Sequence, residues 1–142
     1  MSFIEFAKEV FDIESKAISG LSNLLDDNFT DSVECILGCK GRVIIFGMGK
    51  SGIIGKKIVA TFASTGTPSF FMHPGEAYHG DLGMVTHDDV FLALSNSGET
   101  EEVVKLIPFL KESQNTVISM TGNASSTLAK ASHFHLNIKV HT

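Results

Sequence analysis

Long apolar runs, an excess of basic residues and a secretory type of N-terminus are all missing from this sequence. Its apolar runs are only a few residues long, whereas a membrane-spanning helix needs roughly 20. Its 11 Lys and Arg are spread along the chain and are outnumbered by 16 Asp and Glu, so no basic stripe is available for a nucleic-acid backbone. The N-terminus is acidic and amphipathic, where a signal peptide would be basic and then apolar. We therefore expect a cytoplasmic protein that binds neither nucleic acid nor a membrane.

Cysteine is also scarce, since Cys35 and Cys39 are the only two. A pair at this spacing on a helix could supply two metal ligands, but a structural zinc site takes four. No further Cys or His lies nearby in the sequence to complete the set. We interpret both residues as reduced, partly buried thiols, the usual state of free cysteine, and assign them no chemistry.

The rest of the composition fits one globular domain with a core. The chain has 142 residues, of which 43% are hydrophobic. Short apolar runs predict strands at 42–46, 69–72, 90–94, 116–120 and 134–140. Apolar residues at helical spacing predict helices between them, at 53–63, 99–111 and 123–131. This alternation predicts an α/β fold, a three-layer α/β/α sandwich around a parallel sheet of five strands.

Two helices are predicted before the sheet. Apolar residues recur at helical spacing over residues 3–25, with charged residues between them. Thr30 and Asp31 can cap a second helix that runs through Leu37. Because their apolar faces exceed what one edge of a sheet covers, we interpret the two helices as elements for packing and subunit contacts.

The predicted elements form a single domain over residues 1–142. Its N-terminal helices occupy residues 1–38 and its α/β core residues 42–142. The sequence ends directly after the last predicted strand, which a helix would normally cover. We therefore expect the core to be truncated at this end.

Two turns rich in glycine and hydroxyl groups follow predicted strands. The first, Gly-Met-Gly-Lys-Ser-Gly at 47–52, comes after the strand at 42–46, and the second, Ser-Asn-Ser-Gly-Glu-Thr at 95–100, after the strand at 90–94. Such a turn exposes backbone N–H groups and the positive end of the next helix dipole, which favours an anion. The hydroxyls of the second turn, from Ser95, Ser97 and Thr100, can donate hydrogen bonds to phosphate oxygens. Together the turns predict a site for a small sugar phosphate.

Two other interpretations of these turns stay open. Gly47, Gly49 and Gly52 also satisfy the dinucleotide-binding fingerprint, with Glu76 near the position of a ribose-binding acid. Against this, Lys50 occupies a position where the helix approaches the pyrophosphate, and a second phosphate-type turn exists. Alternatively, the glycines serve only a tight turn, without any ligand. Two such turns on neighbouring strands favour a ligand.

Five short blocks of this sequence are distinctive. They are Gly-Met-Gly-Lys-Ser-Gly at 47–52, Ala-Ser-Thr-Gly-Thr-Pro at 63–68, His-Pro-Gly-Glu-Ala at 73–77, His-Gly-Asp-Leu-Gly-Met at 79–84 and Ser-Asn-Ser-Gly-Glu at 95–99. Together they resemble the sugar isomerase (SIS) domain of D-arabinose 5-phosphate isomerases. The likeness runs from about Phe6 to Val140. It implies a flavodoxin-like sheet and an aldose–ketose isomerase that interconverts D-ribulose 5-phosphate and D-arabinose 5-phosphate through a cis-enediol, for synthesis of Kdo in lipopolysaccharide or capsule.

The resemblance also bears on cofactors and partners. It implies that no cofactor is required and that the protein is a homotetramer whose active sites combine residues of several subunits. The end of the SIS domain and the CBS modules that follow it in most members are not in this sequence. An alternative within the superfamily is a non-catalytic regulatory module that binds a sugar phosphate.

By resemblance, Lys50 and Glu102 match positions of catalytic importance. Lys50, at a helix N-terminus, could hold the phosphate or the enediolate oxygen. Glu102 could act as the base or orient one. His79, in a glycine-flanked loop, is our candidate for a substrate-hydroxyl contact or proton shuttle. For each, the alternative is an ordinary surface or loop-ordering role.

The remaining site residues are predicted to bind substrate or metal. His73 matches a position associated with zinc, and we expect an inhibitory or adventitious ion there rather than a catalytic one. The predicted substrate-binding residues are Gly49, Ser51, Gly66, Thr67, His79, Ser95, Ser97 and Thr100.

Overall fold

Five short strands rich in β-branched and aromatic residues form the centre of the fold. The computed structural model describes residues 1–141. All strands are parallel and lie in the order β2-β1-β3-β4-β5. Their bounds are β1 Val43–Gly47, β2 Ser69–Phe71, β3 Val90–Leu94, β4 Thr116–Thr121 and β5 Phe134–Asn137. The predicted parallel α/β sandwich of the flavodoxin-like kind is confirmed, and each strand lies within or close to its predicted run.

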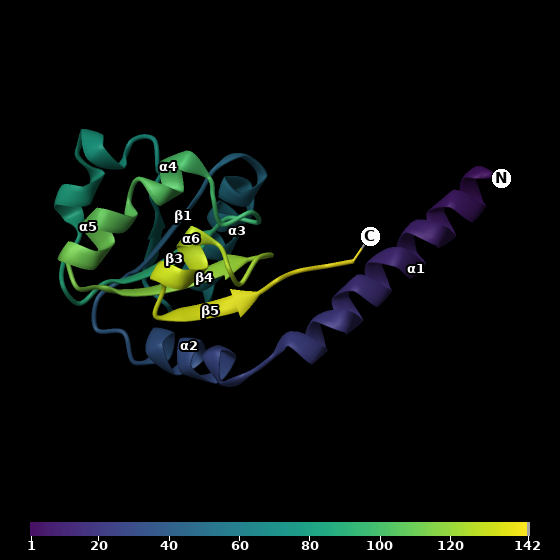
Figure 1. Cartoon of the computed structure of the whole chain (residues 1–142), viewed down its shortest axis with the longest axis horizontal. Coiled ribbons are helices and arrows are strands. Elements are labelled where there is room, and N and C mark those ends of the chain that lie inside the picture. Colours follow the sequence, from purple (N-terminus) through teal and green to yellow (C-terminus); the bar gives the residue numbers. More distant parts are fainter. Residues whose placement is uncertain (142) are drawn as a thin grey trace.

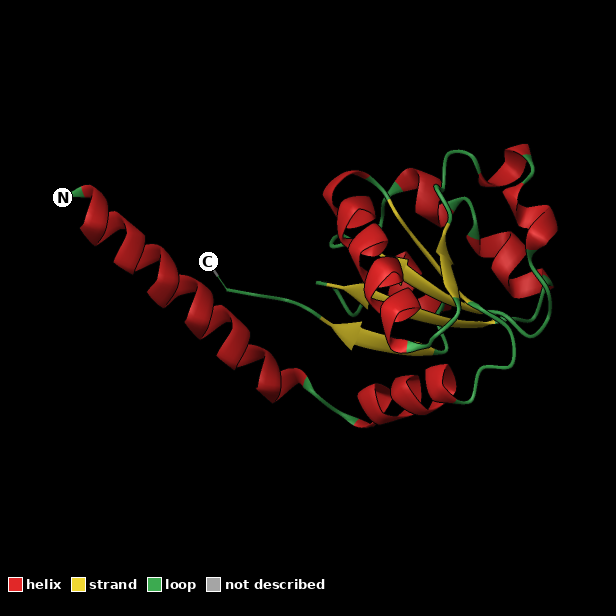
Figure 2. Cartoon of the chain, turned by 180° about the vertical axis from the view of Figure 1, so that it is seen from behind, coloured by secondary structure: helices red, strands yellow, loops and turns green. Residues whose placement is uncertain are grey.

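Helices cover both faces of the sheet (Figure 1, Figure 2). The helices α4 (Glu101–Val104), α5 (Ile107–Glu112) and α6 (Thr127–Ala131) lie over one face, where Phe46 and Phe91 meet edge to face. The helices α2 (Asp27–Leu37) and α3 (Gly49–Thr65) pack on the other, against the cluster that contains Ile45 and Ile118. Because both faces are covered, β1 and β3 are buried along their whole length, as expected for central parallel strands.

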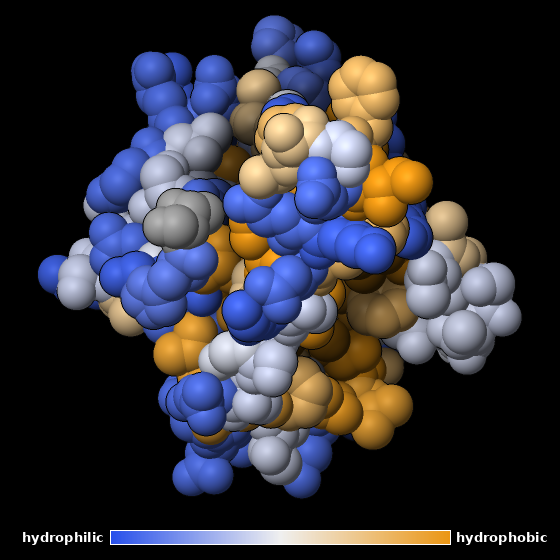
Figure 3. All heavy atoms as spheres, turned by 90° about the vertical axis from the view of Figure 1, so that its right-hand side faces the viewer, coloured by the Kyte–Doolittle hydropathy of each residue, from blue (hydrophilic) through white to orange (hydrophobic). Residues whose placement is uncertain are grey.

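The helix α1 (Phe3–Leu21) projects away from this body (Figure 1). Its start is fixed by a capping box, in which the Ser2 hydroxyl accepts from the Glu5 N–H and the Glu5 carboxylate accepts from the Ser2 N–H. No residue of α1 is buried in this chain. On the side toward which α1 projects, apolar patches interrupt the hydrophilic surface (Figure 3). The predicted long amphipathic helix is confirmed, continued by the 3-10 turn η1 (Ser22–Leu24), and its apolar face is left exposed.

Among the described residues, no helix has both the length and the apolar character needed to span a membrane.

Several details differ from the sequence-based expectations; for example, the helix predicted over 123–131 begins only at Thr127. The helix α2 begins earlier than predicted, because Asp26 and not Thr30 or Asp31 is its cap and accepts from the Asn28 N–H at 2.9 Å. The helix predicted over 99–111 is two helices, with Pro108 in the first turn of α5, where its missing N–H costs nothing. The loop predicted after β2 contains two 3-10 turns, η2 (Ala77–His79) and η3 (Asp81–Met84).

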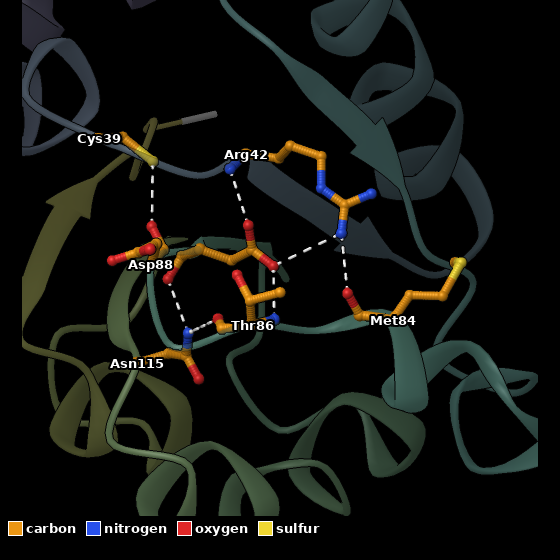
Figure 4. A network of polar contacts seen from close by, with 7 residues as sticks. Cys39, Arg42, Met84, Thr86, Asp88 and Asn115 are labelled. Carbon is orange, nitrogen blue, oxygen red and sulfur yellow. Dashed lines mark hydrogen bonds and ion pairs between the residues drawn. The ribbon is translucent and has the colours of Figure 1, made fainter.

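A buried carboxylate closes this loop onto the amino edge of the sheet (Figure 4). Asp89, only 2% exposed, accepts hydrogen bonds from the backbone N–H groups of Arg42 at 2.7 Å and Thr86 at 2.8 Å. The Arg42 guanidinium lies 3.6 Å from the same carboxylate and donates to the Met84 carbonyl at 2.8 Å. The Asn115 amide bridges the carbonyls of Thr86 and Asp89 at 2.8 Å each. The end of the loop is therefore fastened before β3 begins.

Candidate active site

The two predicted anion-binding turns meet at one point on the carboxyl edge of the sheet. From β1 the chain crosses to β2 on one side, and β3 lies on the other, so β1 and β3 flank the topological switch point. Gly47 at the end of β1 pairs with Leu94 at the end of β3. A Cβ on Gly47 would lie 3.0 Å from the Leu94 carbonyl oxygen, which explains the glycine. Open α/β sheets bind their ligands in the crevice at this position.

The N-terminus of α3 is prepared for an anion. This helix of 17 residues has no side-chain cap, since its N-cap is Met48, and no acidic residue in its first turn. Instead, the first turn carries the exposed Lys50. A cation there opposes the helix dipole, and the first N–H groups have no intrahelical partner. A bound anion would satisfy both the orphan N–H groups and the lysine.

The second turn is held in shape by its own hydroxyls. Ser95, 2% exposed, accepts from the Gly98 N–H at 3.0 Å and shares a hydrogen bond with the Thr100 hydroxyl at 2.8 Å. The exposed Ser97 accepts from the Glu99 N–H at 3.1 Å, which leaves its own proton free to donate. Of the three predicted phosphate ligands, Ser97 is therefore the one that faces solvent, while Ser95 and Thr100 bond to each other.

The three predicted catalytic residues follow three adjacent strands. His79 lies in η2, after β2; Lys50 lies in α3, after β1; and Glu102 lies in α4, after β3. Parallel strands send all three connections out at the same edge of the sheet. Lys50 and His79 are exposed and Glu102 is half-buried. The neighbouring Glu101 pairs instead with Lys105 at 3.1 Å.

A tyrosine that sequence reasoning did not single out joins two of these connections. The hydroxyl of Tyr78 in η2 donates to the backbone carbonyl of Lys105, directly after α4, at 2.8 Å. The turn that carries His79 is therefore in contact with the end of the helix that carries Glu102. Only its position next to His79 could have drawn attention to this residue.

Gly66 and Thr67 lie at the opposite edge of the sheet. Gly66 caps the C-terminus of α3 with a φ of +94°, and Thr67 precedes β2. A helix of 17 residues is about 25 Å long, so both are far from Gly49 at its other end. Within one chain, the structure does not bring these two residues together with the turns, and their role in substrate binding stays a prediction.

The predicted metal and thiol residues carry no assembled site in the part of the chain that is described. His73 is exposed, and its Nδ1 accepts from the Gly75 N–H at 3.1 Å. No group of three or more His, Cys, Asp or Glu among residues 1–141 is arranged to hold a metal ion. Cys35 and Cys39 are free and half-buried, and burial together with the neighbouring Cys39 raises the pKa of Cys35. Zinc binding at His73 stays a prediction.

The geometry gives little support to a dinucleotide-binding site. Glu76 is exposed and lies at the start of η2, beyond the end of β2 at Phe71. A ribose-binding acid would be expected at the end of that strand. The second turn, moreover, stands beside the first at the switch point.

Comparison with known proteins identifies the family to which this chain belongs. The SIS domain model matches residues 36–142. The arabinose 5-phosphate isomerase KdsD of Pseudomonas aeruginosa is 54% identical over 140 residues, 99% of this chain and 43% of that protein. KdsD of Escherichia coli K12 is 53% identical over 138 residues, 97% of this chain and 42% of that protein. This chain thus spans about two fifths of the length of these relatives.

Two solved structures share the fold over all or nearly all of this chain. The structure of E. coli CFT073 c3406 in complex with arabinose 5-phosphate matches with a TM-score of 0.85 and 40% sequence identity. The match covers 100% of this chain and 77% of that one. A second match, a crystal structure of a protein from Bacteroides fragilis NCTC 9343, has a TM-score of 0.89 and 38% identity over 96% of this chain and 73% of its own.

Proposed function

We propose, since this chain belongs to the SIS domain family, that it interconverts D-ribulose 5-phosphate and D-arabinose 5-phosphate. The names of its relatives and the arabinose 5-phosphate complex of a similar structure support this substrate. The observation that carries the proposal is the meeting of two glycine- and hydroxyl-rich turns at the switch point between β1 and β3. A sugar phosphate bound there would lie beside residues from three successive connections.

The phosphate would bind to groups of both turns. The orphan N–H groups at the start of α3, including those of Gly49 and Ser51, point an array of donors at an anion. The free hydroxyl proton of Ser97 and the ammonium group of Lys50 would add two more donors. Gly49 has a φ of +57° and open space around its Cβ position, so the backbone there can lie close to a ligand.

The reaction itself needs a base at carbon, proton transfer between two oxygens, and stabilisation of negative charge. In our proposal, Glu102 takes a proton from C1 of the ketose, or orients the group that does, and the protonated base then returns the proton to C2 of the resulting cis-enediolate. His79 carries the hydroxyl proton from O1 to O2. The ammonium group of Lys50 holds the phosphate or the enediolate oxygen. This chemistry requires no redox cofactor, and any zinc at His73 would be inhibitory or adventitious.

We further propose a cytoplasmic homotetramer with shared active sites, acting in the synthesis of Kdo for lipopolysaccharide or capsule. Two features support the assembly. The apolar face of α1 is exposed in the single chain, and Gly66 and Thr67 lie at the edge of the sheet remote from the turns. A second copy of the chain would cover the apolar face of α1, and assembly could bring Gly66 and Thr67 to the site of a neighbouring subunit.

Proton NMR with D-ribulose 5-phosphate in deuterated buffer tests the activity. We expect D-arabinose 5-phosphate to appear, with deuterium at the transferred carbon-bound position. Lys50→Ala and Glu102→Gln should lower turnover by orders of magnitude without changing the circular dichroism spectrum, whereas the control Lys57→Ala, on the exposed part of α3, should not. Shifts of protein signals without product would show that this chain binds the sugar phosphate but does not turn it over, and would leave the non-catalytic binding module as the alternative.

A further inference from the structure

The carboxylate of Glu99 is turned away from the phosphate turn to which it belongs. Its Oε1 accepts a hydrogen bond from the Thr127 N–H at 3.0 Å, and its Oε2 accepts from the Thr127 hydroxyl at 3.1 Å. Thr127 is the first residue of α6, so both oxygens bind the beginning of that helix. These hydrogen bonds, first from the hydroxyl and then from the N–H, lower the pKa of Glu99, which is therefore ionised at neutral pH.

The backbone of the same turn is fastened to the same helix. The Gly98 carbonyl accepts from the Leu128 N–H at 3.1 Å. Gly98 has a φ of +68°, and a Cβ on it would overlap the side chain of Ser126. Ser126 is itself the cap of α6 and accepts from the Ala129 N–H at 3.2 Å. The turn is thus joined to the start of α6 by the Glu99 side chain and the Gly98 carbonyl. A residue larger than glycine at position 98 would not fit between them.

We propose that Glu99 is a positioning residue for substrate binding: it clamps the turn at 95–100 to α6 and so holds Ser97 in place for the phosphate. This inference rests on the proposed function, because it assigns a purpose to the rigidity of that turn. A loose turn would have to be ordered by the ligand, at the expense of affinity. The clamp provides that order before the substrate arrives.

Electrostatics alone makes the opposite prediction. A carboxylate near a doubly charged phosphate repels it, so removal of the charge of Glu99 should tighten binding. If the clamp dominates, removal of the side chain should weaken binding instead. Glu101 is the matched reference, since it is an exposed acid in the same region and pairs with Lys105 at 3.1 Å. The sign of the change therefore separates the two explanations.

Two substitutions of Glu99 separate charge from contact. Glu99→Gln removes the charge, but its amide oxygen can still accept from the Thr127 N–H and its NH₂ can donate to the Thr127 hydroxyl. Glu99→Ala removes the charge and both contacts. We expect dissociation constants for inorganic phosphate and for D-arabinose 5-phosphate, measured by NMR titration, to be unchanged or lower in Glu99→Gln. In Glu99→Ala they should be about fivefold higher, the size of one lost net hydrogen bond.

Two further variants check the assignment. Thr127→Val removes one of the two donors from the other side of the clamp and should weaken phosphate binding in the same direction, by a smaller factor. Glu101→Ala should leave the dissociation constant unchanged or lower it. Because Glu99 is exposed, melting temperatures should change little in all four variants. Weaker phosphate binding can then be attributed to a change in the turn at 95–100 and not to a loss of overall stability.

Some outcomes would overturn the proposal. Tighter binding by Glu99→Ala would show that charge outweighs the clamp, and equal weakening by Glu99→Ala and Glu101→Ala would show an effect unrelated to Thr127. If the unsubstituted chain binds phosphate but does not isomerise the sugar, only the proposed activity is contradicted, and the variants still test the clamp. If the unsubstituted chain binds neither phosphate nor D-arabinose 5-phosphate, both proposals are contradicted.

Discussion

The hydroxyl of Tyr78 donates a hydrogen bond to the backbone carbonyl of Lys105, with 2.8 Å between the two oxygens. Tyr78 directly precedes His79, and Lys105 directly follows the helix of Glu102. The bond crosses from the connection after β2 to the connection after β3. It therefore sets the spacing between two of the proposed catalytic side chains, although neither takes part in it.

Tyr78→Phe should consequently lower kcat more than it raises KM. The substitution removes only the hydroxyl, and a misplaced catalytic group costs turnover before it costs affinity. We expect kcat to fall about fivefold to tenfold, with the melting temperature nearly unchanged because the tyrosine is exposed. Steady-state kinetics with D-arabinose 5-phosphate measures both constants. Ser64→Ala, which removes another exposed hydroxyl bonded to a backbone carbonyl, is the control and should have parental kinetics.

Asp89→Asn should destabilise the fold. An amide can accept from only one of the two N–H groups that the carboxylate satisfies, and it leaves the Arg42 guanidinium without its buried counterion. We expect the free energy of unfolding in urea to fall by about 2 to 4 kcal/mol. The adjacent Asp88 is exposed, so Asp88→Asn should change stability by no more than about 0.5 kcal/mol. Similar effects of both variants would argue against the network.

Much of the fold could be predicted because the local signals are strong. The strand β3 has the predicted bounds, since an apolar run between polar loops leaves little choice. Gly66 ends α3 as predicted, because the left-handed conformation there favours glycine. The two turns were predicted to lie together because neighbouring parallel strands end at the same edge of a sheet. The structure places them side by side, at the paired ends of β1 and β3.

The parts that could not be predicted depend on contacts between distant residues. The clamp joins Glu99 to Thr127, and the Tyr78 hydroxyl reaches Lys105, and neither pair shares a local pattern. The break between α4 and α5 was missed because Pro108 is tolerated in a first helical turn as well as at a bend. The amphipathic pattern of α1 indicated that its apolar face needs a partner, but a periodic pattern does not say whether the partner is this chain or another.

The exposed face of α1 predicts an effect of substitution on assembly. Ile4, Phe11 and Ile18, spaced by seven residues, share one side of the helix and are 69%, 70% and 70% exposed. The double variant Phe11→Glu and Ile18→Glu should reduce the molar mass in light scattering toward that of a single chain, because it places charge in an apolar interface. Helix content should be retained.

Asp12→Asn on the polar side of α1 is the control for this experiment. Asp12 is exposed, and its neighbours one turn away are all polar (Lys8, Glu9, Ser15 and Lys16), so a change of charge there should leave the molar mass as it is in the parent. An unchanged mass in the double variant as well would show that the apolar face of α1 is not an interface between copies.

Stability should fall as the medium becomes mildly acidic, through His135. Burial, opposed by a backbone hydrogen bond with Thr121 and the charge of Asp26, lowers the pKa of His135 from its ordinary value of 6.5. Below that value the unfolded chain binds the proton more readily than the folded one, so the free energy of unfolding decreases toward the lowered pKa. Urea unfolding at about pH 7.5 and about pH 5.5 should show a smaller loss for His135→Gln than for the parent. His87→Gln, at an exposed histidine, should behave like the parent, and an equal loss in all three proteins would assign the pH dependence to other groups.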